Sequence, residues 1–171
     1  MILDGYWKHD LRRIKSELIF WRKWGFGDFA KHQISRGLLY SAAIIRKIAE
    51  DEKDAERTIE KSQRPMPPLP IIKICVPVKR YRHTDPDKFF VNSKVILSDY
   101  DLQHAETDEL YLFQICNQII HSYTWAVVYS GKSYIYGVLV ASDREKEKDI
   151  ILLSVADRIN AIQDVSDKSA I

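Results

Sequence analysis

The chain has 171 residues, of which 46% are hydrophobic and 29% are charged. This length and composition fit one globular domain with a substantial core and exclude an intrinsically disordered chain. The two cysteines, Cys75 and Cys116, form neither a CxxC pair nor a disulfide framework, and the charged amino terminus lacks the pattern of a signal peptide. We therefore expect a cytoplasmic protein with no membrane partner, since no apolar run approaches the roughly 20 residues of a membrane span.

The formal net charge of +2 conceals an uneven distribution of charge along the chain. Residues 1–94 contain 20 Lys and Arg against 12 Asp and Glu, a balance of +8, whereas residues 95–171 contain 6 against 12, a balance of −6. A basic half beside an acidic half is compatible with a nucleic-acid surface, with two sub-structures that attract each other, or with a surface that docks a charged protein. Charge alone leaves these alternatives open.

Residues 1–64 are predicted to form an antiparallel helical hairpin. A first apolar stripe repeats at spacings of three and four residues, as on one face of a helix. It consists of Trp7, Leu11, Ile14, Leu18 and Trp21. The glycines at 25 and 27 end this helix, and Asp28 can cap a second one. The second apolar face consists of Ile34, Leu38, Ala42, Ile45 and Ala49. Because the connecting loop is short, the two helices should pack against each other.

The amino-acid composition changes after the hairpin. The prolines of PMPPLP (65–70) end it and form either a stiff connector or a polyproline ligand. The β-branched and aromatic segments 71–78 and 89–97 predict strands, and Pro77 favours an edge position for the first of them. A central helix is expected over about 107–121, with Thr107 as its N-cap.

The last part of the chain predicts a β-meander over about 122–155. Two strands are joined by a turn at SGKS, and a charged connection at 144–149 leads to a third strand. A short helix should close the chain. We therefore expect a single α+β domain, residues 1–171, in which the helical hairpin and the central helix pack with an antiparallel sheet.

Some segments resemble cofactor or metal sites, but the residues around them do not fit such sites. AVVYSGKS at 126–133 approximates a phosphate-binding loop, but the strand-like YIYGVLV follows it in place of the helix that such a loop requires. The five histidines stand at no recognised ligand spacing, and no serine or cysteine has the context of a nucleophile. We therefore expect no metal and no cofactor.

A basic cluster ends the first predicted strand region and consists of Lys79, Arg80, Arg82 and His83. These residues are candidates for binding RNA phosphates or an acidic partner. Charges at a strand end more often form a solvated edge that discourages aggregation, so that alternative stays open.

The segment CNQIIHSY (116–123) holds the remaining candidate chemistry. On a helix, Asn117 and His121 lie four residues apart on one face, while Cys116 and Ile119 face the core. A histidine beside a carboxamide is suited to proton transfer. The same pair is also suited to capping the end of the helix, so a structural role stays open.

This segment resembles the signature of the HEPN superfamily, small helical domains of bacterial defence and toxin–antitoxin proteins. The family motif is an arginine, often followed by asparagine, then a few residues and a histidine, frequently with a tyrosine nearby. Asn117, His121 and Tyr123 match it, whereas Cys116 stands at the arginine position. The resemblance implies metal-independent RNA cleavage, in which the arginine stabilises the phosphate and the histidine moves protons. Because a cysteine cannot stabilise that charge, activity requires another basic residue, for which Arg46 and Arg36 are candidates.

Three functions follow, in this order. The first is a non-catalytic interaction protein with a protein partner, such as the immunity or antitoxin member of a bacterial defence or toxin system. The second is a metal-independent endoribonuclease that uses His121 and Asn117, and the third is RNA binding without cleavage. A homodimer also fits, because the aromatic stripe of Trp7, Trp21 and Trp24 exceeds what one small helix covers.

Overall fold

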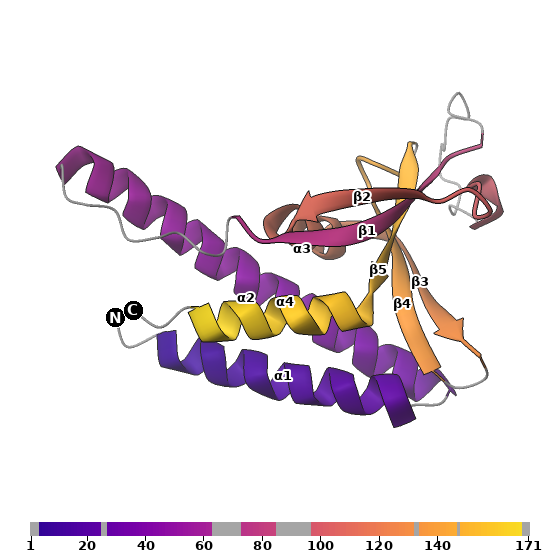
Figure 1. Ribbon diagram of the computed structural model, residues 1–171, viewed down its shortest axis with the longest axis horizontal. Coiled ribbons are helices and arrows are strands. Elements are labelled where there is room, and N and C mark those ends of the chain that lie inside the picture. Colours follow the sequence, from indigo (N-terminus) through magenta and orange to yellow (C-terminus); the bar gives the residue numbers. More distant parts are fainter. Residues whose placement is uncertain are drawn as a thin grey trace.

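The computed structural model describes residues 4–24, 27–62, 73–84, 97–131, 134–146 and 148–168. Within these ranges the chain forms four α-helices and one five-stranded antiparallel sheet (Figure 1). The helices are α1 (Asp4–Trp24), α2 (Gly27–Ser62), α3 (Leu112–Ile120) and α4 (Val155–Lys168). The strands are β1 (Cys75–Arg82), β2 (Glu106–Tyr111), β3 (Ser122–Ser130), β4 (Tyr134–Ser142) and β5 (Asp149–Ser154). The expected α+β class is confirmed.

The expected hairpin of α1 and α2 forms because each helix carries one apolar stripe. Leu11, Ile14 and Leu18 of α1 are buried, as is the whole predicted apolar face of α2. The two backbones approach closely at Gly37, where an added Cβ would lie 2.9 Å from the Leu18 side chain. At the start of α2, Gly27 adopts a positive φ of 68°, a conformation that glycine tolerates without strain.

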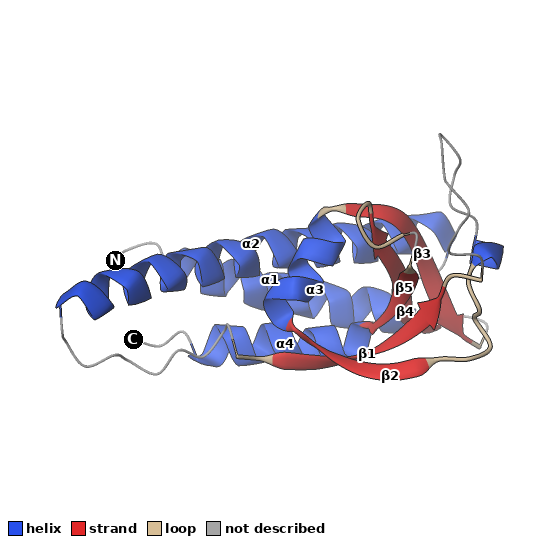
Figure 2. Cartoon of the chain, turned by 90° about the horizontal axis from the view of Figure 1, so that it is seen from above, coloured by secondary structure: helices blue, strands red, loops and turns tan. Residues whose placement is uncertain are grey.

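The sheet has the strand order β2-β1-β5-β4-β3, so β3, β4 and β5 form the expected meander and α4 follows as the expected last helix. The four helices share one core with one face of the sheet, to which β1, β4 and β5 contribute Val78, Val140 and Leu153. Seen from above, the helices form an elongated layer with the sheet toward one end (Figure 2). The other face carries a smaller cluster around Tyr100, whose hydroxyl donates to the carbonyl of Lys146 at 2.6 Å.

The predicted start of the central helix is wrong. Residues 106–111 form strand β2, and α3 begins at Leu112 instead of near Thr107. β2 pairs with β1 in an unbroken antiparallel register from Arg80↔Glu106 to Cys75↔Tyr111. This long-range pairing overrides the local capping signal at Thr107.

The edge position that Pro77 suggested for the first strand is also wrong, because β1 lies between β2 and β5. The register explains how the proline is accommodated: β5 pairs only with residues 79–82, so at Pro77 the strand has β2 alone as its partner. The proline segment 65–70, residues 71–72 and most of the predicted strand at 89–97 lie outside the described residues.

Candidate functional site

α3 separates an apolar side from a polar side. Leu112, Ile115, Cys116 and Ile119 are buried, whereas His121 at the C-cap is exposed. The side-chain carbonyl of Gln114 accepts a hydrogen bond from the Tyr111 N–H at 3.0 Å, which fixes the start of the helix. The His121 N–H donates to the Asn117 carbonyl at 3.0 Å, which fixes its end. Cys116 of the motif therefore lies in the core, whereas His121 lies at the surface.

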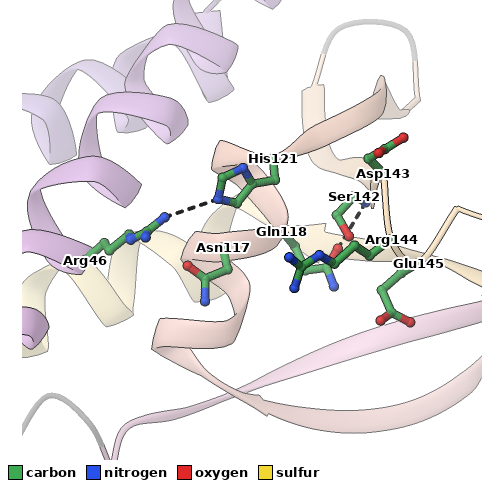
Figure 3. Close-up of a pocket in the computed structure, with 8 residues that line it drawn as sticks. All are labelled: Arg46, Asn117, Gln118, His121, Ser142, Asp143, Arg144 and Glu145. Carbon is green, nitrogen blue, oxygen red and sulfur yellow. Dashed lines mark hydrogen bonds between the residues drawn. The ribbon is translucent and has the colours of Figure 1, made fainter.

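Arg46 of α2 lies directly against His121, as Figure 3 shows. Its Nη1 is 3.2 Å from His121 Nε2, and its Nε donates to the Glu50 carboxylate at 2.9 Å. A guanidinium only donates hydrogen bonds, so Nε2 is the acceptor and the neutral imidazole carries its hydrogen on Nδ1. Glu50 holds the arginine from its own helix, one turn further along, and this leaves the Nη atoms directed toward α3.

A cavity of about 470 Å³ opens beside this pair. It is lined by Arg46, Asn117, Gln118, His121, Ser142, Asp143, Arg144 and Glu145 (Figure 3). Two hydrogen bonds join the turn after β4 to α3: the Ser142 N–H donates to the Gln118 side chain at 3.0 Å, and the Asp143 N–H donates to the His121 carbonyl at 3.2 Å. Backbone and side chain together thus hold α2, α3 and the 142–145 turn around one space.

Among the polar side chains that line this cavity, the acids have partners and some of the others do not. Asp143 pairs with Lys146 at 2.5 Å, and Glu145 lies 3.9 Å from Lys148. Within the described part of the chain, Arg144 makes no hydrogen bond or ion pair, and neither does the Asn117 carboxamide. The acids are therefore occupied by lysines, while two arginines, a histidine and an amide border open space. Such a set is suited to an anion, above all a phosphate.

The basic cluster predicted from the sequence is dispersed by the fold. Arg80 binds Asp108 at 2.7 Å and Asp149 at 2.8 Å, and Arg82 binds Glu106 through two bonds of 2.7 and 2.9 Å. These hydrogen bonds lower the pKa of Asp108 and of Glu106 below the ordinary range of carboxyl groups. The charge asymmetry along the chain therefore reflects, in part, the pairing of the basic strand β1 with the acidic strand β2 and with Asp149 of β5.

The other two members of the cluster also lie apart. His83 is buried, and its ring packs edge-on against Tyr100 with centroids 5.3 Å apart. Lys79 is exposed on β1. Arg80 lines a second cavity of about 300 Å³, which shares Asn117, Gln118 and Glu145 with the first. Of the predicted basic residues, the structure thus brings only Arg80 close to the polar face of α3.

Position 116, where the HEPN motif has arginine, lies inside the core. Cys116 is fully buried, and its Sγ accepts a hydrogen bond of 3.4 Å from Nη2 of Arg158 on α4, which is only 1% exposed. Arg36, the other candidate substitute for the missing arginine, is 3.8 Å from Glu17 and borders a different hollow. Arg46 is therefore the candidate that meets His121.

Sequence reasoning missed Gln118, Ser142 and Arg144. Gln118 lies within the singled-out segment 116–123, whereas the signal for Ser142 and Arg144 was the charged turn after a strand, and such turns are usually solvated connections. Among the described residues, no group of three or more His, Cys, Asp or Glu could hold a metal ion. Within the same ranges, none of the helices has both the length and the apolar character that a bilayer span requires.

Comparison with models of protein families, with curated proteins and with solved structures found no match for this chain. Its function is therefore inferred from its own residues.

Proposed function

We propose that this chain is a metal-independent endoribonuclease whose active site is the cavity between α2, α3 and the 142–145 turn. The observation that carries the proposal is the 3.2 Å contact between Arg46 Nη1 and His121 Nε2. It places beside the motif histidine a guanidinium that Cys116 does not supply. This pairing is what favours the ribonuclease over the other two functions.

The two side chains supply the two requirements of RNA transphosphorylation. His121 Nε2 accepts the proton of a ribose 2′-hydroxyl, whose oxygen attacks the adjacent phosphorus. The bond between phosphorus and the 5′-oxygen breaks, and that oxygen takes a proton from water. Arg46 stabilises the negative charge that grows on the phosphate oxygens. The products are a 2′,3′-cyclic phosphate and a 5′-hydroxyl, and no metal takes part.

The contact between Arg46 and His121 also implies that a phosphate binds before His121 accepts a proton. In the free protein the guanidinium donates to Nε2, which occupies the lone pair that would receive the proton. A phosphate is a stronger acceptor than an imidazole, so a bound phosphate takes over the guanidinium and releases Nε2. Arg144 faces the same cavity and adds a second cation for the phosphate.

The experiment is cleavage of RNA in EDTA, with the ends of the products identified. We expect wild-type protein to cleave an RNA oligonucleotide and to leave a 2′,3′-cyclic phosphate. His121→Ala should lower the rate by about 10²- to 10⁴-fold. An oligonucleotide with 2′-deoxyribose at the cleavage site should stay intact. Cleavage that survives either change would refute the proposed chemistry, and no cleavage by the wild-type protein would refute the function.

The second candidate is the non-catalytic interaction protein, such as an immunity or antitoxin protein. It is favoured by large apolar side chains that stay exposed on α1 and at the start of α2, namely Tyr6, Phe20, Trp24 and Phe29. Phe20 and Phe29 both pack edge-on against Trp21, so they lie together where the two helices meet, and exposed aromatic side chains gathered in this way are typical of a protein-binding surface. This candidate predicts intact RNA in the assay above and a stoichiometric complex with a protein partner.

A further inference from the structure

One edge of the sheet, at β3, carries none of the charges or prolines that commonly block pairing. Its sequence, SYTWAVVYS, contains no charged residue, no proline and no glycine. Among the described strands, β3 pairs with β4 alone and stands at the end of the strand order (Figure 1). Most of its residues are half-exposed, whereas most of β4 is buried. A long apolar edge of this kind presents another strand with backbone N–H and C=O groups that no described strand pairs.

The opposite edge of the sheet is protected. β2 has the sequence ETDELY, and its acids Glu106, Asp108 and Glu109 would repel a second β2 strand. Glu106 and Asp108 also hold the arginines of β1 by ion pairs. β2 therefore carries charges of the kind by which natural sheets prevent pairing between chains, and β3 carries none.

We propose that β3 pairs with β3 of a second copy of this chain, antiparallel across a two-fold axis. An axis at Ala126 places Trp125 opposite Val127 and Thr124 opposite Val128, so every cross-strand pair is free of like charges. The pairing of β3 with β4 is irregular between Ser122 and Thr124 and again between Val128 and Tyr129. The extra residue of the first irregularity, Tyr123, belongs to β3 and precedes the regular segment 124–128, whereas that of the second, Tyr136, belongs to β4.

A second copy of this chain fits the two different edges of the sheet better than a strand of another protein or an open-ended fibre does. One two-fold contact uses the β3 edge of both chains, and the acidic β2 edges that remain do not pair further. The result is a closed dimer with one continuous sheet. This inference does not depend on the proposed ribonuclease activity.

The surface beside β3 supplies the additional contact area that a stable dimer needs, since one strand pair falls short of the roughly 800 Å² per partner of a standard interface. A hollow of about 420 Å³ lies between α2 and the start of β3. Leu39 and Tyr40 of α2 line it together with Trp125 of β3, and these two α2 residues are 44% and 54% exposed. A strand added to β3 extends its side chains toward this hollow, so edge and hollow form one continuous surface.

The first test is the mass of the wild-type protein by sedimentation equilibrium over about 1–100 µM. We expect the mass of two chains. Leu39→Lys should weaken the dimer by at least about tenfold, since it places a charge on the interface. Tyr6→Lys is the control, because Tyr6 is 71% exposed at the start of α1, a helix that lines no part of this hollow, and it should leave the dimer unchanged. A monomer at every concentration overturns the proposal, as does a dimer that responds equally to both variants.

The second test locates the strand pairing and needs no destabilising change. In a Cys75→Ser background, Ala126→Cys lies on the proposed axis and should form a disulfide between two chains under mild oxidation. Thr107→Cys on β2 should not. In the wild-type protein, backbone amides of residues 124–128 should exchange with solvent more slowly as the protein concentration rises. No cross-link at 126, or exchange that is independent of concentration, overturns the β3 contact even if a dimer exists.

Discussion

Arg158 is a charged residue whose removal should stabilise the protein. Its side chain is 1% exposed, and its Nη2 donates a hydrogen bond to the Cys116 Sγ at 3.4 Å. Within the described residues, Nε and Nη1 have no hydrogen-bond partner. A buried donor that lacks a partner costs about 1–3 kcal/mol, and an arginine keeps its charge in proteins.

Arg158→Met replaces this guanidinium by an apolar side chain of similar length. Substituting well-packed apolar groups for buried charges is often stabilising by about 1–4 kcal/mol. For a chain of this size, each kcal/mol raises Tm by about 2–4 °C. Urea unfolding should show a higher midpoint with an unchanged m value. The control is Arg12→Met on the exposed side of α1, which should change stability by no more than about 0.5 kcal/mol.

The opposite result would refute this reasoning. If Arg158→Met lowers the stability by more than about 1 kcal/mol while Arg12→Met does not, the contact with Cys116 outweighs the burial of the charge. The electrostatic account of position 116 would then be wrong.

Three further predictions concern buried or paired groups. Cys116→Arg restores the HEPN motif but buries a second cation beside Arg158, so it should destabilise the protein by at least about 3 kcal/mol in urea unfolding and add no cleavage activity. Burial raises the pKa of Tyr100 above its ordinary value near 10, so the stability that its neutral form provides is complete below about pH 10 and declines above it. Tyr100→Phe should therefore remove this decline above pH 10, as measured by unfolding curves at pH 9, 10 and 11. The hydrogen bond from Arg80 lowers the pKa of Asp108, so its contribution is present above about pH 4 and is lost as the pH falls; Arg80→Gln should flatten that loss in unfolding curves at pH 5, 4 and 3.

Local patterns were sufficient to predict the helices at both ends of the chain and the meander. The stripe of Leu11, Ile14 and Leu18 has helical spacing, and only that face is buried. The strands after α3 are β-branched and joined by short turns. β2 was not predictable in this way, because Thr107 and Glu109 suit a helix start and the strand forms through its pairing with β1.

The site was predictable in its parts but not in its assembly. Asn117 and His121 are four residues apart, so their shared helix face follows from the sequence. The contact with Arg46 spans 75 residues and depends on how α2 crosses α3, which no local pattern contains. Arg144 belongs to a turn whose position depends on the hydrogen bond between Ser142 and Gln118.

The most direct test of the central claim compares two arginines of the same helix. Arg46→Ala removes the guanidinium beside His121, and Arg36→Ala removes one that pairs with Glu17 outside the proposed site. In an RNA cleavage assay in EDTA, we expect Arg46→Ala to lower the rate by about 10²- to 10³-fold and Arg36→Ala to leave it within about twofold of wild type. Equal rates for the two variants, with both proteins folded, would contradict the assignment of Arg46 as the catalytic cation.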